Sequence, residues 1–358
     1  MRRLSGVVTG ALIGVALLSA GCDLGAATPV PVAPGGGATT PTAAVSVVTP
    51  TARPMTKIVV AMGYIANVQF APYYVAQDRG YYADEGLEVE FKYGQVNDLL
   101  KVVSTGAIDY ANVGGDEMVP AVAQGVPVRY VLTQYYKYPV AAAALAGTVL
   151  KAPADLKGHK VGIPGPYGSN YIGLKALLKA GKLTESDIKE QSIGFTQVSA
   201  LSQRQVDIAM VYSMNEPVQL KSQGKDVTTL QVSDYMDLAA VGVATSEKKI
   251  RENPEQVQAF VRATLRGTAD TLKDPAAAFA SSMARTPEIT DPAQQSIQRA
   301  VLTTTLAFMT PPAGRDPGSS DPATWKTTEA FLREIGLTNK PIDPTTLYTN
   351  DFIAPDTH

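Results

Sequence analysis

The stretch KIVVAMGYIANVQFAPYYVAQDRGYYADEGLEVEF, residues 57–91, decides the fold of this chain. It predicts a strand over 57–62, a polar loop over 63–69, a helix that carries tyrosines and a second strand over 87–91. Loops that follow the carboxyl ends of strands in an open α/β sheet are the usual ligand sites of such folds. We therefore expect this loop to form half of a binding site for an uncharged, flat small molecule. Its side chains offer aromatic faces and amides without charge: Tyr64, Asn67, Gln69 and Phe70.

Length and composition indicate a folded protein of two lobes. A chain of 358 residues is long for a single core. Hydrophobic residues make up 45% of it and charged residues 18%, which is typical of a globular chain. The formal net charge of −2 gives no basic surface that would favour a nucleic acid as partner. With one cysteine and two histidines, the chain offers no intramolecular disulfide and too few ligands for a zinc site, so no metal is expected.

The N-terminal segment predicts export and attachment to a membrane. A basic start, an apolar run over 4–18 and small residues before Cys22 are the marks of a secretory signal peptide over 1–21. The small residues before Cys22 are similar to a bacterial lipobox; the alternative is an ordinary signal peptide with an incidental cysteine. Residues 22–55, rich in Ala, Thr, Pro and Gly, are expected to form a loose tether. A diacylated Cys22 would hold the protein at the cell membrane, facing the extracytoplasmic side.

Beyond residue 56, strands alternate with helices at the spacing of βαβ units, which predicts an α/β fold with largely parallel sheets. Further strands are expected over 110–113, 128–133, 160–163, 192–195, 208–211, 231–235 and 238–245. Helices are expected over 98–104 with Asn97 as N-cap, over 117–124 with Asp116 as cap, and over 171–180, 200–204, 254–269, 275–285, 293–306 and 321–335. In the last helix, Trp325, Phe331 and Leu332 form an apolar face that is expected to pack into the core.

Polar and aromatic loops follow the predicted strands in both halves of the chain, over 63–70, 114–117, 134–138, 164–170 and 212–216. Two lobes that turn such loops toward each other form a cleft that can hinge shut on a ligand. At 164–170, a capped helix start with nothing bound is an equally good reading. No serine–histidine–acid set, nucleophilic cysteine or phosphate loop accompanies the loops, so neither a catalytic site nor a cofactor is expected. The candidate ligand contacts beyond the first loop are Asp116, Gln134, Tyr135, Tyr136, Tyr138, Tyr167, Ser169, Asn170, Tyr212, Asn215 and Glu216.

Several motifs, taken in order, resemble one known family. The segments YYVA (73–76), GYYADEGL (80–87), GAIDY (106–110) and DLKGHKVG (155–162) are similar to those of periplasmic solute-binding proteins related to thiamine-pyrimidine and alkanesulfonate importers. The C-terminal part adds ENPEQV at 252–257, Trp325, EIGL at 334–337 and LYTNDF at 347–352, the last three of which resemble the thiamine-pyrimidine branch. On this resemblance the chain is an ABC-importer solute-binding lipoprotein of the ThiY/RibY-like family.

The resemblance implies a type II periplasmic-binding fold, in which two α/β lobes joined by a two-segment hinge hold the ligand between them. Lobe 1 is then expected over 56–140 and 240–358, and lobe 2 over 141–239. The implied partner is the ABC permease in the membrane, to which a binding protein without enzymatic activity delivers its ligand. We expect the protein to be a monomer.

Riboflavin, or a related flavin, is the expected ligand, and a thiamine-precursor aminopyrimidine is the alternative. The pyrimidine binders usually carry a Trp-Thr-Pro-Asn type of first loop with a histidine following, and residues 63–70 contain neither tryptophan nor histidine. The related pyrimidine-forming enzymes need histidines and a cysteine cluster that this chain lacks, so an enzyme is the least favoured reading. A flavin ring stacks on aromatic side chains, and ribityl hydroxyls bond to amides and carboxylates.

Overall fold

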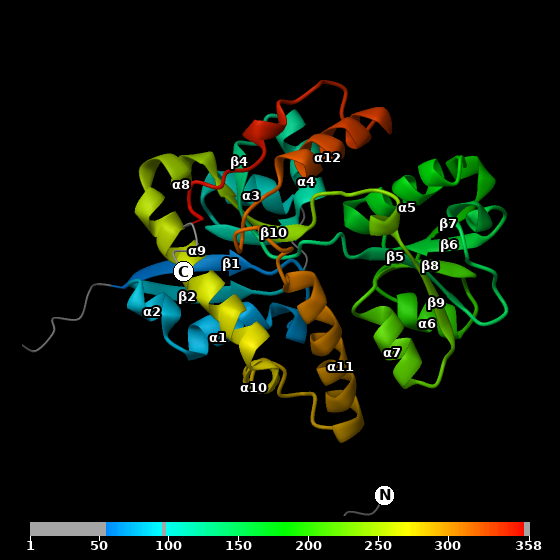
Figure 1. Ribbon diagram of the computed structural model, residues 1–358, viewed down its shortest axis with the longest axis horizontal. Coiled ribbons are helices and arrows are strands. Elements are labelled where there is room, and N and C mark those ends of the chain that lie inside the picture. Colours follow the sequence, from blue (N-terminus) through cyan, green and yellow to red (C-terminus); the bar gives the residue numbers. More distant parts are fainter. Residues whose placement is uncertain (1–54, 95–97, 354–358) are drawn as a thin grey trace, which may run out of the picture. The chain divides into compact units, whose positions relative to one another are not determined.

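The computed structural model describes residues 55–94 and 98–353. The predictions for the signal peptide, Cys22, the tether before residue 55 and the Asn97 cap lie outside these residues. The described part of the chain belongs to one compact unit, Ala52–His358. Within that unit it forms two five-stranded sheets with helices packed around them (Figure 1).

The first sheet combines strands from the start of the described chain with one strand that returns from much later. In order across the sheet, the strands are β2 (Leu87–Lys92), β1 (Thr56–Ala61), β3 (Tyr110–Gly114), β10 (Val241–Ser246) and β4 (Val128–Thr133). β1 pairs in parallel with β2 and β3, whereas β10 pairs antiparallel with β3 and β4. In this sheet β10 is therefore the reversed strand, and the prediction of a largely parallel sheet is confirmed.

The second sheet repeats this arrangement. Its strands, in order, are β7 (Lys189–Ser192), β6 (Lys160–Ile163), β8 (Ile208–Tyr212), β5 (Val140–Leu145) and β9 (Val227–Gln231). β6 pairs in parallel with β7 and β8, and β5 pairs antiparallel with β8 and β9. Here β5 is the reversed strand, at the same place in the order that β10 occupies in the first sheet.

The described chain crosses between the two sheets twice. It leaves the first sheet after Thr133 and enters the second at Val140; it leaves the second after Gln231 and re-enters the first at Val241. Each crossing leads into the reversed strand of the sheet that it enters. Two connecting segments are what the predicted hinge requires, while the lobe boundaries and the hinge motion stay predictions.

Aspartate–proline pairs start three of the C-terminal helices. Asp274, Asp291 and Asp321 each accept a backbone N–H from the first turn of the helix that follows, at 3.0, 3.2 and 2.9 Å. The following proline has no N–H to leave unpaired and its φ is already helical, so the pair fixes the helix start. The helices are α1 (Ala71–Asp78), α2 (Tyr81–Asp84), α3 (Leu99–Thr105), α4 (Gly115–Ala123), α5 (Gly168–Ala180), α6 (Gln197–Ser202), α7 (Glu216–Ser222), α8 (Glu247–Glu252), α9 (Pro254–Lys273), α10 (Pro275–Met283), α11 (Pro292–Met309) and α12 (Pro322–Glu334).

The apolar face predicted on the last helix is confirmed. Trp325, Phe331 and Leu332 of α12 are all buried. The Trp325 ring meets the Tyr130 ring of β4 edge-on at 5.1 Å between centroids and stacks on Tyr348 at 5.4 Å. Such aromatic pairs add about 0.5–1.5 kcal/mol each beyond the area they bury. They attach α12 and the C-terminal segment to the first sheet.

Two predicted strands lie elsewhere, and one strand was not predicted. The strand expected over 192–195 is β7, three residues earlier, because the edge sequence KEQS carries no apolar signal. The strand expected over 231–235 is β9, which ends at Gln231 and belongs to the second sheet. β5, with the sequence VAAAAL, was missed because alanine has a low strand propensity, although all six of its residues are buried.

Asp116 is not the cap of its helix. α4 begins at Gly115 with Gly114 as N-cap, and the side chain of Glu117 accepts the backbone N–H of Gly114 at 3.0 Å. α5 likewise begins three residues before its predicted start, at Gly168. Ser169 and Asn170 therefore lie in the first turn of a helix rather than in the preceding loop.

Candidate functional site

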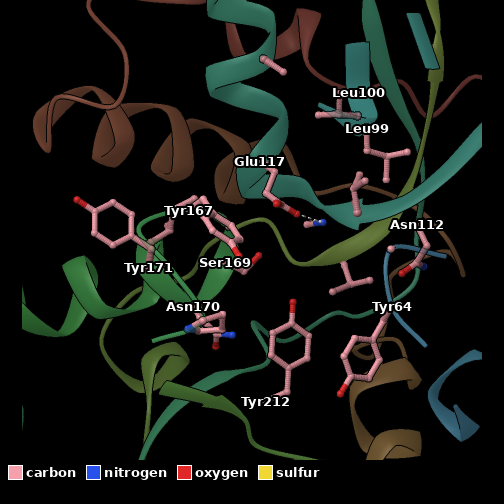
Figure 2. Close-up of a pocket in the computed structure, with 18 of the residues that line it drawn as sticks. Tyr64, Leu99, Leu100, Asn112, Glu117, Tyr167, Ser169, Asn170, Tyr171 and Tyr212 are labelled. Carbon is pink, nitrogen blue, oxygen red and sulfur yellow. Dashed lines mark hydrogen bonds between the residues drawn. The ribbon is translucent and has the colours of Figure 1, made fainter. Parts of the chain in front are cut away.

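A cavity of about 870 Å³ lies at the carboxyl ends of strands from both sheets. All five of the polar and aromatic loops predicted after strands contribute to its wall. In Figure 2, Tyr64 and Asn112 lie on one side of the cavity, and Tyr167, Tyr171 and Asn170 lie on the other. The parallel strands of each sheet end at one edge, which is why loops distant in sequence meet there.

The structure brings ten of the fifteen nominated side chains into the wall of this cavity. Their role as ligand contacts stays a prediction, but their position is the one that such a role requires. They are Tyr64, Gln69, Phe70, Tyr135, Tyr167, Ser169, Asn170, Tyr212, Asn215 and Glu216.

The other five nominated residues do not line the cavity, because their polar groups bond inside the protein. Asn67 accepts the backbone N–H of Gln69 and so caps a short 3-10 helix (Val68–Phe70). Gln134 Oε1 accepts bonds from the Tyr73 hydroxyl at 2.9 Å and from Asn112 Nδ2 at 2.6 Å. The Tyr136 hydroxyl accepts the backbone N–H of Gly318.

The last two of the five, Asp116 and Tyr138, bond to each other behind the cavity. The Tyr138 hydroxyl lies 2.5 Å from Asp116 Oδ2 and 2.9 Å from the carbonyl oxygen of Ser169, and the Ser169 hydroxyl donates to Asp116 Oδ1 at 2.9 Å. The Tyr138 hydroxyl has one proton and can donate it to only one of these two oxygens. When Asp116 is protonated, it can donate to the Tyr138 hydroxyl, which then donates to the Ser169 carbonyl oxygen, so that both contacts are hydrogen bonds. Burial, reinforced by the charge of Glu117, raises the pKa of Asp116 to about 7. This cluster joins α4, the first crossing segment and α5.

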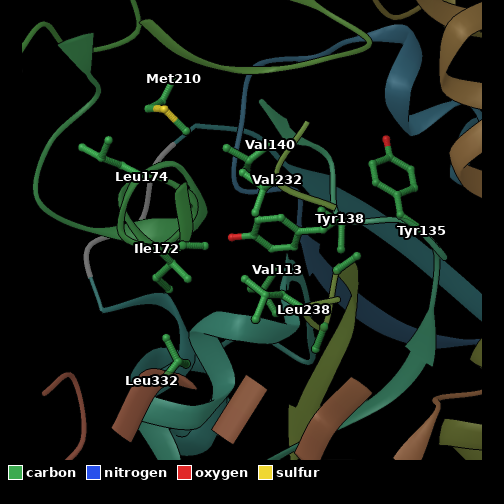
Figure 3. Close-up of a cluster of buried hydrophobic side chains, with 14 of the residues drawn as sticks. Val113, Tyr135, Tyr138, Val140, Ile172, Leu174, Met210, Val232, Leu238 and Leu332 are labelled. Carbon is green, nitrogen blue, oxygen red and sulfur yellow. The ribbon is translucent and has the colours of Figure 1, made fainter. Parts of the chain in front are cut away.

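Tyr135 and Tyr138 are three residues apart in the sequence, but their side chains point to different parts of the protein (Figure 3). Tyr138 lies among Val113, Val140, Val232 and Leu238, while Tyr135 points away from this group. Both rings are buried, but only Tyr135 also faces the cavity.

The aromatic side chains of the cavity come from both sheets. Tyr64 follows β1 in the first sheet, and Phe195 follows β7 in the second; their ring centroids are 5.9 Å apart at an interplanar angle of 61°. Phe195 is 45% exposed, which is unusual for so large an apolar side chain. Tyr212 and Tyr167 add two more rings to the wall. The arrangement suits a flat ring system that stacks on tyrosine.

Amide groups in the wall are available to a polar ligand. Asn170 Oδ1 is buried and has no hydrogen-bond partner among the described residues. A buried acceptor without a partner is costly, by about 1–3 kcal/mol, unless a ligand or water supplies a donor. Asn215 and Gln69 also line the cavity. A ligand with ring N–H or hydroxyl donors therefore fits this wall.

Two glutamates stand in the cavity wall. Glu216 accepts the backbone N–H of Tyr212 at 2.9 Å and the Asn215 side-chain amide at 3.1 Å. Burial raises the pKa of Glu216 to about 7, and burial also raises the pKa of Glu117. Each carboxyl group can therefore accept from, or when protonated donate to, an uncharged polar ligand.

Sequence reasoning missed several lining residues. Glu117 was passed over for its neighbour Asp116; the signal that identifies it is a glutamate three residues after an N-cap. Asn112 is a polar residue within the buried strand β3, which was itself a usable signal. Phe195 was missed because it was assigned to a strand.

Two comparisons of the sequence with known proteins identify the family. The model of the family described as NMT1/THI5 like matches residues 67–278. The chain belongs to the NMT1/THI5-like family. Over 333 residues it is 42% identical to the riboflavin-binding protein RibY of Chloroflexus aurantiacus, a match that covers 91% of this chain and 92% of that one.

Other proteins similar to this chain are named for different functions. The chain is 25% identical to the formylaminopyrimidine-binding protein of Halalkalibacterium halodurans, over 79% of this chain and 86% of that one. It is 24% identical to the 4-amino-5-hydroxymethyl-2-methylpyrimidine phosphate synthase of Legionella pneumophila, over 84% and 93%. The relatives of this chain therefore include both binding proteins and enzymes.

The solved structures confirm the fold. The periplasmic aliphatic sulphonate binding protein SsuA of Escherichia coli matches with a TM-score of 0.66 at 16% identity, over 84% of this chain and 95% of that one. The chain thus has the predicted type II periplasmic-binding fold of two α/β lobes. No helix in the described part of the chain is long and apolar enough to cross a bilayer.

Proposed function

We propose that this protein is the substrate-binding lipoprotein of an ABC importer and that it captures riboflavin, or a closely related flavin, in the cavity between its two sheets. The observation that carries the proposal is the large cavity lined by tyrosines, in a chain that is 42% identical to a riboflavin-binding protein over nearly its whole length. The permease in the membrane is the partner that receives the ligand.

The size and lining of the cavity support a flavin. Small-molecule pockets usually measure about 300–1,000 Å³, and this one, at about 870 Å³, lies in the upper part of that range. A three-ring flavin with a ribityl chain uses such a volume better than a single-ring pyrimidine. Tyr64 and Tyr212 supply faces for the rings. Asn170 Oδ1 offers an acceptor to a ring N–H or a ribityl hydroxyl.

A formylaminopyrimidine is the second candidate ligand, favoured by the 25% identity to a protein that binds it. Against it stand the cavity volume and the composition of the first loop, 63–70, which contains no tryptophan and no histidine.

We propose a binding role rather than an enzymatic one. Within the described residues the histidine is His159, which directly precedes β6. Its Nδ1 lies 3.4 Å from Asp207 Oδ2, and it does not line the cavity. The described residues contain no group of three or more His, Cys, Asp or Glu side chains that could hold a metal ion. The cavity wall thus presents stacking and hydrogen-bonding groups without a histidine base.

The anchor and the cellular location belong to the same proposal. Cys22 would carry the lipid, and residues 23–55 would hold the binding unit off the outer face of the cell membrane. A monomer is sufficient for this role because both walls of the cavity come from one chain.

The ligand that travels with the protein tests the proposal. The protein is purified from riboflavin-supplemented cells, and its visible absorption and the mass of the released ligand are recorded. A yellow protein that releases riboflavin supports the proposal. A colourless protein that releases, or tightly binds, a formylaminopyrimidine would instead establish the second candidate.

A further inference from the structure

The charged side chains of the cavity are unevenly distributed. Among the described lining residues, the acidic ones are Asp98, Glu117 and Glu216, and Lys101 is the basic one. Lys101 pairs with Asp98 at 2.9 Å, and their side chains are 54% and 65% exposed. The opposite charges of Lys101 and Asp98 therefore offset each other where the cavity meets solvent. No described lysine, arginine or histidine forms an ion pair with Glu117 or Glu216.

Glu117 occupies the position at which a helix start would otherwise receive an anion. Backbone N–H groups at helix N-termini are a common binding place for phosphate. Here Glu117 Oε2 accepts the N–H of Gly114 at the start of α4 (dashed line in Figure 2). Its other oxygen faces the start of α5, 3.4 Å from the place where a Cβ on Gly168 would stand. The side-chain carboxylate of Glu117 therefore lies between the N-terminal ends of α4 and α5, which face the cavity.

The side chain of Glu216 places a second carboxylate in the cavity wall, on the side of the second sheet. Glu216 follows β8, and its two oxygens bond to the Tyr212 N–H and to the Asn215 amide, both of which are neutral groups. At a pH above the raised pKa values of these carboxyl groups, an anionic ligand group placed against either glutamate would meet a like charge in a buried setting with no cation to offset it. Like charges brought together at an interface are a strong means of rejecting a wrong partner. Hydroxyl groups, in contrast, can donate to these oxygens.

We propose that Glu117 and Glu216 restrict the cavity to uncharged flavins and exclude phosphorylated ones such as riboflavin 5′-phosphate. This selectivity rests on the proposed function and deepens it, because it names the form of the flavin that is captured. Uptake of a phosphorylated flavin through this protein would then require a phosphatase-type reaction beforehand, in which water releases phosphate and leaves the free hydroxyl.

Titration of the purified protein with riboflavin and with riboflavin 5′-phosphate tests this inference through the quenching of flavin fluorescence. At pH 8, above the raised pKa of Glu216, the wild type is expected to bind the phosphate ester at least about 100-fold more weakly than riboflavin. In Glu117→Gln, which keeps an oxygen to accept the Gly114 N–H, the ratio of the two affinities is expected to narrow by about tenfold or more. Glu216→Gln should act in the same direction. Glu255→Gln, on the exposed first turn of α9 and outside the cavity, is the matched control and should leave the ratio unchanged.

The outcomes separate the inference from the function beneath it. Equal affinity of the wild type for both flavins overturns the inference and leaves the riboflavin proposal standing. An unchanged ratio in both glutamine variants also overturns it, because another feature would then cause the exclusion. Failure of the folded wild type to bind riboflavin overturns the proposed function, and the inference with it. Circular dichroism confirms that each variant is folded, and the wild-type ratio is a test that needs no variant.

Discussion

Replacing Asp116 with asparagine is expected to make the stability of the protein less dependent on pH between pH 5 and 8. Asp116 is fully buried and bonds to Ser169, to the backbone N–H of Glu117 and to Tyr138. Asparagine has the same shape as a protonated aspartic acid. Its oxygen can accept the first two bonds, and its amide can donate to Tyr138, whose hydroxyl then donates to the Ser169 carbonyl. The variant therefore imitates the protonated form at every pH.

The sign and size follow from the pKa. Burial, reinforced by Glu117, raises the pKa of Asp116 from 3.8 to about 7. Between these values the folded protein holds a proton that the unfolded chain has released, so the free energy of unfolding falls as pH rises through this window. The slope for one such group is at most about 1.4 kcal/mol per pH unit, which amounts to at most about 4 kcal/mol over the whole window. Glu216 acts in the same sense and remains in the variant, so the slope is reduced rather than abolished.

Urea unfolding of the ligand-free protein at pH 5, 6, 7 and 8 measures the effect. Relative to the wild type, Asp116→Asn should gain about 2–3 kcal/mol in the free energy of unfolding on going from pH 5 to pH 8, because the slope ends near the pKa of about 7. Asp343→Asn is the matched control: Asp343 is exposed, and hydrogen bonds to Thr345 lower its pKa, so it does not titrate in this range. A difference between Asp116→Asn and wild type that stays constant across the four pH values would refute the reasoning.

Three further predictions concern the ligand, the core and the anchor. Tyr64→Ala should weaken riboflavin binding by about 1–3 kcal/mol in a fluorescence titration, because stacking and burial are lost. Tyr235→Ala, at an exposed position outside the cavity, is the control and should bind riboflavin like the wild type. Equal riboflavin affinity of Tyr64→Ala and the wild type would remove Tyr64 from the site. Gly242→Ala should lower the melting temperature strongly or prevent folding. The Cβ of the alanine would lie 1.9 Å from the Tyr130 hydroxyl oxygen and 2.1 Å from the Leu132 carbonyl oxygen. An unchanged melting temperature would contradict the close packing of β10 on β4. Cys22→Ala should move the protein from the membrane fraction to the soluble fraction, and continued membrane association would argue against a lipid on Cys22.

Much of the fold could be predicted from local patterns. The run of residues 57–91 contains a strand, a loop, helices and a second strand at nearly the predicted places because the apolar period changes clearly within it. The C-terminal helices begin within about one residue of their predicted starts, because the capping that fixes a helix start is local chemistry. β5 and β7 escaped because an alanine-rich central strand and a polar edge strand both lack the expected apolar alternation.

The cavity was predictable at the level of loops but not of every side chain. Ten nominated residues line it because loops after parallel strands meet at one edge of a sheet. Tyr138 was misplaced because nothing local shows which residues of a crossing segment turn toward the core. Asp116 was chosen over Glu117 because it was expected to be the N-cap at the end of the loop. In the structure α4 already begins at Gly115, and Glu117 is the residue of this pair that lines the cavity. Such errors of one residue decide which carboxylate a ligand meets.

The most direct test of the account is a calorimetric titration of the ligand-free protein with riboflavin and, separately, with a formylaminopyrimidine. The cavity volume and its tyrosine wall predict saturable one-to-one binding of riboflavin, with the pyrimidine binding more weakly. Tight binding of the pyrimidine by a protein that shows no heat with riboflavin would contradict the central claim.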